Sequence, residues 1–129
     1  MKPTRIIYCA KASRSERNMG CEGLEERQTT GGGGTNNTPD DVCGKYGSIK
    51  AKQQNTHPTV KPLKLMEYLC ILTKTPTGGI ILDPFAGSGT TLMAAKKIGR
   101  DYIGIEKESE YVKIAEARLR AVKIQKTLL

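Results

Sequence analysis

The feature that most constrains the fold of this chain is the sequence GIILDPFAGSGTT at residues 79–91. A short apolar, β-branched run ends at Asp83, a glycine-rich turn follows, and a helical pattern begins at Thr90. Gly87 and Gly89 allow positive φ angles and a close ligand approach, and the N–H groups at the start of the helix can bind an anion. The stretch therefore predicts a strand, a tight turn and a helix that form a nucleotide-type pocket.

Three kinds of pocket share this outline. A phosphate-binding P-loop needs a lysine after its last glycine, where this chain has Thr90, so that type is excluded. A dinucleotide site needs a third glycine where this chain has Leu92, so that alternative is weakened but stays open. S-adenosylmethionine carries an ammonium, a carboxylate and a ribose diol, and its site needs one acid at the strand end and a second acid one strand later. Asp83 and Glu106 meet this requirement.

Glu106 closes a second predicted strand at residues 101–106. It lies roughly twenty residues beyond the glycines, which is the spacing of a ribose-binding acid in a βαβ unit. Because the two strands should be adjacent and parallel, their terminal acids should converge on one pocket.

Length and charge limit the possible functions. A chain of 129 residues forms at most one modest domain, and its polar, glycine-rich first half places most of the core in the second half. The net charge of +8 favours a polyanionic partner such as nucleic acid, although a basic surface also serves solubility. No apolar run approaches the roughly eighteen residues of a membrane span, and no secretory signal is present, so we expect a cytoplasmic protein.

The four cysteines are spread along the chain without a Cys-x-x-Cys pair. A mixed site from Cys9, Cys21, Cys43 and His57 can be drawn, but its spacings are arbitrary, so we expect reduced thiols and no metal.

The first half of the chain carries few structural signals. Residues 5–10 predict a short strand, followed by a basic segment that is either a helical turn or a loop. Lys11, Arg14 and Arg17 could face DNA there, and a merely solvated charged face is an equal alternative. Residues 28–54 are rich in Gly, Thr and Asn, so we expect a mobile loop.

The second half predicts three helices. Residues 55–62 are extended because of their prolines, and a helix begins near Pro62. We expect its apolar face to pack on the sheet through Leu65, Met66, Leu69 and Leu72 or Thr73. The helix after the glycine-rich turn should end at Gly99, and a long amphipathic helix should follow with Ser109 as its N-cap.

The face of that long helix is marked by Tyr111, Ile114, Ala115, Arg118, Leu119 and Val122. The C-terminal end of this helix carries four basic residues: Arg118, Arg120, Lys123 and Lys126. We assign them to dipole complementation and solubility rather than to DNA contact.

Three motifs in this order resemble those of the amino-directed DNA methyltransferases, which modify N6 of adenine or N4 of cytosine. Residues 83–91 match the cofactor loop of that family, residues 57–62 match the motif that leads into a helix, and residues 103–106 match the strand that ends in the ribose-binding acid. The likeness covers residues 55–122, so the chain resembles the C-terminal, cofactor-binding portion of a site-specific enzyme.

The resemblance implies an α/β, Rossmann-like, S-adenosylmethionine-dependent methyltransferase fold whose sheet is incomplete in this chain. Residues 1–54 would form a basic N-terminal strand and a mobile loop, and residues 55–129 the portion that binds S-adenosyl-L-methionine. Asp83 would hold the methionine ammonium, Phe85 would pack beside the cofactor, and His57 would orient the loop. The implied cofactor-binding set is Thr59, Lys61, Asp83, Phe85, Ala86, Gly87, Ser88, Gly89, Thr90, Glu106 and Lys107. Within it, the carboxylate would lie among Thr59, Lys61, Ser88 and Thr90, the ribose at Glu106, and the adenine near Lys107.

One motif of the family is missing. Its members bind the flipped-out base with a Pro-Pro-aromatic motif, and this sequence contains no Pro-Pro dipeptide. We therefore expect no catalytic residue in this chain, weak or no DNA methylation by it alone, and a companion chain or upstream segment that carries the base site. Double-stranded DNA would be the substrate, in a bacterial, archaeal or phage restriction-modification system. A non-catalytic nucleic-acid-binding or partner-docking module, and a methyltransferase acting on RNA or protein, stay open as alternatives.

Overall fold

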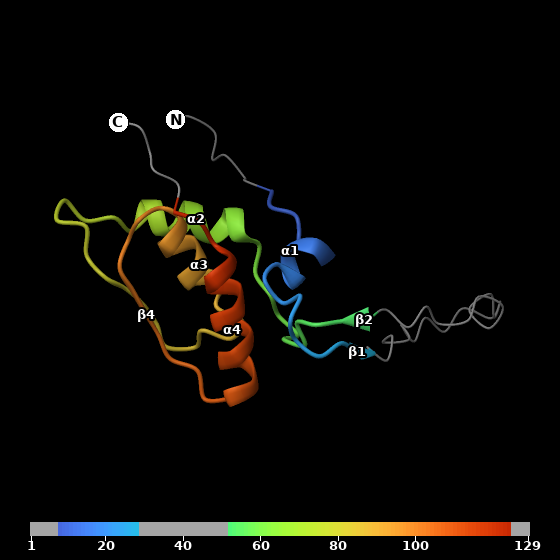
Figure 1. Cartoon of the computed structure of the whole chain (residues 1–129). Helices are drawn as coiled ribbons and strands as arrows, with labels where there is room; N and C mark the ends of the chain where they lie inside the picture. Colours follow the sequence, from blue (N-terminus) through green and yellow to red (C-terminus); the bar gives the residue numbers. More distant parts are fainter. Residues whose placement is uncertain (1–7, 29–51, 125–129) are drawn as a thin grey trace, which may run out of the picture.

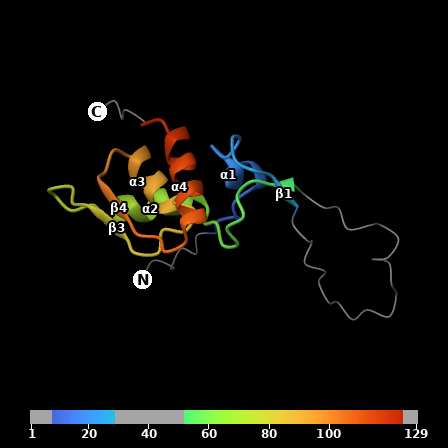
Figure 2. The ribbon, with the colours of Figure 1, turned by 60° about the horizontal axis from the view of Figure 1, so that its bottom comes forward.

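The computed structural model describes residues 8–28 and 52–124 of the chain. Its elements are α1 (Arg14–Asn18), β1 (Arg27–Gln28), β2 (Lys52–Gln53), α2 (Leu63–Leu72), β3 (Ile81–Asp83), α3 (Thr90–Lys97), β4 (Tyr102–Gly104) and α4 (Ser109–Ala121). Helices α2, α3 and α4 group together, and α1 with the β1–β2 pair lies beside them (Figure 1). Turned by 60°, the molecule shows α4 between α3 and α1 (Figure 2).

The unit β3–α3–β4 forms as the sequence predicts. Strands β3 and β4 pair in parallel, with Asp83 opposite Gly104. Beyond the strands the pairing continues, because the Ile105 N–H donates to the Asp83 carbonyl and the Ala86 N–H donates to the Ile105 carbonyl, both at 2.9 Å. Helix α3 is followed by Gly99 at φ +74°, the left-handed position where glycine ends a helix.

The core lies among the three longer helices. It contains Leu63, Cys70, Met93, Ala94 and Val122, and Met66, Ile81, Ile98 and Leu119 pack against it. The apolar face expected for α2 is therefore wrong in part, because Leu69 and Leu72 are exposed. Helix α2 packs on α3 rather than on the sheet, and this rotates Leu63, Met66 and Cys70 inward. Pro62 is the N-cap of α2 rather than its first helical residue.

Helix α4 buries most of the predicted face, including one charged residue. Ile114, Ala115 and Val122 are buried, and so is Arg118. The burial of Arg118 confirms its place on the predicted face and corrects its assignment to the basic end that serves solubility. Ser109 is the first helical residue and Glu108 is the N-cap, which corrects the predicted cap by one position.

The N-terminal part differs from expectation in two places. Residues 5–7 lie outside the described residues, and residues 8–10, which should have completed a strand, form none. Residues 29–51 of the expected loop also lie outside the described residues, while its ends pair as the antiparallel β1–β2 ribbon. This part packs on α4, because a Cβ on Gly20 would lie 2.7 Å from the Ala121 Cβ. The boundary at residue 54 stays a prediction.

One face of the β3–β4 pair is covered and the other is bare. On the covered face, a Cβ on Gly104 would clash with Cδ1 of Leu92 in α3. The opposite face carries four apolar side chains, each 51–62% exposed: Ile80, Leu82, Ile103 and Ile105. Parallel sheets are normally covered on both faces. We call these four residues the bare sheet face.

Candidate functional site

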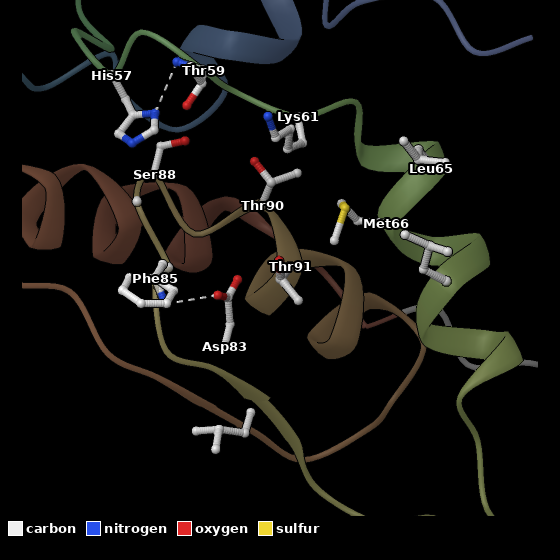
Figure 3. Close-up of a pocket in the computed structure, with 14 residues that line it drawn as sticks. His57, Thr59, Lys61, Leu65, Met66, Asp83, Phe85, Ser88, Thr90 and Thr91 are labelled. Atoms are coloured by element: carbon white, nitrogen blue, oxygen red, sulfur yellow. Dashed lines mark hydrogen bonds between the residues drawn. The ribbon is translucent and has the colours of Figure 1, made fainter.

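A cavity of about 540 Å³ opens at the carboxyl end of β3. It lies between the glycine-rich turn, helix α2 and the segment at residues 57–61 (Figure 3). Its lining residues are His57, Thr59, Lys61, Leu65, Met66, Leu69, Leu82, Asp83, Phe85, Ala86, Gly87, Ser88, Thr90 and Thr91. The volume is within the range of small-molecule sites, roughly 300–1,000 Å³.

Opposite charges lie at separate places in this cavity. Asp83 and Phe85 lie at one side, and Lys61 lies near Thr90 and Ser88 at the other (Figure 3). The Asp83 Oδ1 accepts a hydrogen bond of 3.1 Å from the Phe85 N–H, which orients the carboxylate at the strand end. Phe85 itself is 88% exposed. The cavity can therefore bind a ligand that carries both a cation and an anion.

The glycines of the turn are required by close packing. Gly87 has φ +53°, and a Cβ there would lie 2.6 Å from the His57 Nε2. Gly89 has φ +74°, and a Cβ there would lie 2.9 Å from the Ala115 Cβ. Gly89 is also the N-cap of α3, so the turn leads directly to the unpaired N–H groups of the helix.

His57 supports the turn. Its Nδ1 accepts a hydrogen bond of 3.3 Å from the Thr59 N–H, and its ring lies edge-on to Tyr111 at 4.6 Å between centroids. Burial lowers the pKa of His57, so the neutral ring that this hydrogen bond requires is favoured. This geometry agrees with the orienting role expected for His57.

Glu106 binds the turn from outside the cavity. Its carboxylate accepts hydrogen bonds from the Glu108 N–H at 3.0 Å and the Gly87 N–H at 2.8 Å. These bonds, the one from Glu108 first, lower the pKa of Glu106 and keep it ionised. The structure thus brings eight of the eleven predicted cofactor residues to the cavity lining, while Gly89, Glu106 and Lys107 do not line it.

Two buried polar residues make contacts that the sequence did not predict. Arg118 is fully buried and donates from Nη1 to the Ser88 carbonyl at 2.7 Å. Asn55 is also fully buried, and its side chain donates to the Arg17 carbonyl and accepts from the His57 N–H. A cation within an otherwise apolar helical face was the only signal for Arg118, and no sequence signal marked Asn55.

The predicted DNA-facing residues separate in the structure. Lys11 and Arg14 are exposed, whereas Arg17 is half-buried and donates to the His57 carbonyl at 3.1 Å. Arg17 therefore has a structural contact beneath the site.

Cys9, Cys21 and Cys70 are free thiols, and Cys43 lies outside the described residues. In the part of the chain that the structure describes, no cluster of His, Cys, Asp or Glu could hold a metal ion. Within the same ranges no helix is long and apolar enough to span a bilayer.

The sequence of this chain is similar to those of several type II methyltransferases. It is 54% identical over 70 residues to the type II methyltransferase M2.DpnII of Streptococcus pneumoniae, a match that covers 54% of this chain and 26% of that protein. It is 47% identical over 83 residues to the type II methyltransferase M.HinfI of Haemophilus influenzae, covering 64% of this chain and 23% of that protein. The chain thus spans about a quarter of the length of these relatives.

Among solved structures, the M1.HpyAVI–SAM complex is 52% identical, with a TM-score of 0.45 over 50% of this chain and 31% of that one. A family model described as DNA methylase matches residues 6–117, which is most of the chain. This protein therefore belongs to the DNA methylase family, as its three motifs predicted.

Proposed function

We propose that this chain is the S-adenosyl-L-methionine-binding portion of a DNA methyltransferase that modifies N6 of adenine or N4 of cytosine. The observation that carries the proposal is the charge arrangement of the cavity, with Asp83 at one side and Lys61, Ser88 and Thr90 at the other. The methionine part of the cofactor carries an ammonium and a carboxylate on one carbon. The two sides of the cavity complement these two groups.

The predicted polar and aromatic residues have separate roles in this proposal. Asp83 binds the ammonium, and Lys61 with the nearby hydroxyls binds the carboxylate. The Glu106 carboxylate accepts backbone hydrogen bonds from Gly87, Lys107 and Glu108. Its two oxygens together have about four acceptor positions, so Glu106 can still bind a ribose hydroxyl at the rim. Lys107 then lies near the adenine, and Phe85 packs beside the cofactor.

The chemistry asks little of this chain beyond positioning. When bound, S-adenosylmethionine would supply an electrophilic sulfonium methyl group to the exocyclic nitrogen of a flipped-out base. The residues of this chain would hold that methyl group in line with the nitrogen. We assign no catalytic residue to this chain because the Pro-Pro-aromatic base motif does not occur in its sequence.

We further propose that double-stranded DNA is the substrate and that a companion chain or an upstream segment supplies the base site. The net charge of +8 supports a nucleic-acid partner. The bare sheet face supports an additional polypeptide layer, since an exposed apolar patch beside a parallel strand pair needs cover. Activity of the isolated chain is then weak or absent.

A cofactor titration tests the proposal. Asp83→Asn keeps an oxygen for the Phe85 N–H but removes the charge, and should weaken S-adenosylmethionine binding by about 10- to 100-fold. The matched control is Asp101→Asn, which removes the charge of an exposed acid that does not line the cavity. It should leave the affinity for S-adenosylmethionine unchanged. Equal affinity in the two variants would contradict the site.

A tritium-transfer assay on DNA tests the incompleteness of the chain. Robust transfer by the isolated chain would show that no additional base site is needed. Retained DNA binding without any cofactor affinity would instead support the non-catalytic module.

A further inference from the structure

Arg118 lies directly behind the anion side of the cavity. Its Nη1 lies within hydrogen-bond distance of three oxygens: the Ser88 carbonyl at 2.7 Å, the Ser88 Oγ at 2.9 Å and the Thr90 Oγ1 at 3.0 Å. Because Nη1 carries two hydrogens, one of its N–H groups is shared between two of these oxygens. Its Nη2 donates to the Glu16 carbonyl at 3.3 Å, and its Nε is buried without a partner. Among the described residues, no acid forms an ion pair with this guanidinium.

These contacts determine how the two hydroxyls present themselves to the cavity. A hydroxyl has one O–H to donate, and guanidinium can only donate, so the Ser88 and Thr90 oxygens are acceptors toward Arg118. Each O–H must then donate to something else. Both residues are buried and line the cavity, and the described residues offer neither O–H a protein acceptor. The cavity wall therefore carries two O–H donors that need an acceptor.

The buried charge of the Arg118 guanidinium also favours an anion at this side of the cavity. The Glu16 carboxylate attracts the Arg118 guanidinium but forms no ion pair with it among the described residues, so burial still lowers the pKa of Arg118. An anion just across the two hydroxyls would offset part of this burial penalty. Lys61 at the same side is exposed, so its attraction for an anion is screened by water more than that of Arg118.

We propose that Arg118 is a positioning and specificity-determining residue, which turns the Ser88 and Thr90 hydroxyls into donors and thereby selects the carboxylate of the bound methionine group. This inference rests on the proposed function, because it assigns the acceptor to S-adenosylmethionine. It differs from a purely structural role in one measurable respect. Arg118 should matter for ligands that have the carboxylate and not for those that lack it.

The test compares S-adenosylmethionine with decarboxylated S-adenosylmethionine, which keeps the sulfonium and the ammonium. Both are titrated into the full chain and followed by amide NMR spectra, which also report whether each variant is folded. Arg118→Met should weaken binding of S-adenosylmethionine by about 10- to 100-fold and that of the decarboxylated compound by less than about 3-fold. Arg120→Met, an exposed arginine on the same helix, is the matched control and should affect neither.

Two further variants keep the inference testable if Arg118→Met does not fold. Arg118→Lys retains the charge but has one nitrogen in place of the fork, and Thr90→Val removes one oriented hydroxyl while keeping Arg118. Each should weaken only the carboxylate-bearing ligand. Equal weakening of both ligands in these variants, or equal affinity of the wild-type chain for both ligands, would overturn the role of Arg118 while leaving the cofactor site standing. A wild-type chain that binds neither ligand would instead overturn the proposed function.

Discussion

The contact between Gly87 and His57 should be the most sensitive point of the turn. At φ +53°, a Cβ on Gly87 would lie 2.6 Å from Nε2 and 2.9 Å from Cε1 of the imidazole. The ring cannot simply move aside, because it is held by the Thr59 N–H and by its edge-on contact with Tyr111. Gly87→Ala therefore forces either the turn or the imidazole out of place.

A second glycine separates the two parts of this effect. Gly99 has a similar positive φ of +74°, but a Cβ there would meet no atom within 4 Å. Gly99→Ala should therefore lower the free energy of unfolding only by the left-handed penalty, about 1–2 kcal/mol. Gly87→Ala carries the same penalty and adds overpacking of about 1–3 kcal/mol. The expected total for Gly87→Ala is about 2–5 kcal/mol.

Urea unfolding of the two variants and of the double variant Gly87→Ala/His57→Ala measures this difference. The double variant should recover much of the excess loss, because removing the imidazole removes the clash, and the coupling should be visible in a double-mutant cycle. Equal losses in Gly87→Ala and Gly99→Ala, or no coupling with His57, would show that the imidazole does not limit the turn.

Three other expectations follow from the described contacts. Acidification should lower the free energy of unfolding in two stages, because both pKa values are lowered by folding. The stability that each group contributes is fully present above its unfolded-state pKa, about 6.5 for His57 and 4.3 for Glu106, and is lost as the pH falls through its folded-state pKa. Urea unfolding measured over a range of pH should lack one stage in His57→Gln and the other in Glu106→Gln. Arg100→Met should lower the free energy of unfolding, measured by thermal unfolding, by about 1–3 kcal/mol. The substitution removes the hydrogen bonds that the Arg100 guanidinium donates to the Cys70 and Gly78 carbonyls, which hold the loop after α2. Leu82→Ser on the bare sheet face should change unfolding by less than about 0.5 kcal/mol, whereas Ile81→Ser on the core side should lose several times more.

The local parts of the fold were predictable because their signals are local. Residues 79–91 carry a strand pattern, positive-φ glycines and a helix start within one short window, and the structure confirms β3, the turn and α3 there. The orientation of α2 was not predictable in the same way. Its sequence has apolar residues on most sides, so the choice of buried face depends on α3, which contributes Met93 and Ala94 to the shared core.

Arg118 shows a different limit. Charged residues near a helix C-terminus usually face water and complement the helix dipole, and that rule assigned Arg118 to solubility even though the residue also lies on the predicted face. Its burial depends on oxygens of the glycine-rich turn thirty residues earlier in the chain, on Ser88 and Thr90. Such a long-range polar contact has no periodicity to reveal it, although an arginine within an apolar stripe is a usable warning.

The cavity and the bare sheet face share one wall, and this links ligand affinity to the additional polypeptide layer that we propose. Leu82 belongs to both, and Phe85 beside it is 88% exposed, so the cavity is open on the side where the sheet lacks cover. A ligand in the isolated chain would keep part of its surface in water there. Calorimetry should accordingly give weak affinity with a small negative heat-capacity change, because little apolar area is buried on binding. A large negative heat-capacity change would mean that much apolar area is buried on binding, so that the cavity closes over the ligand in the isolated chain. That result would contradict the open wall as the reason for weak binding.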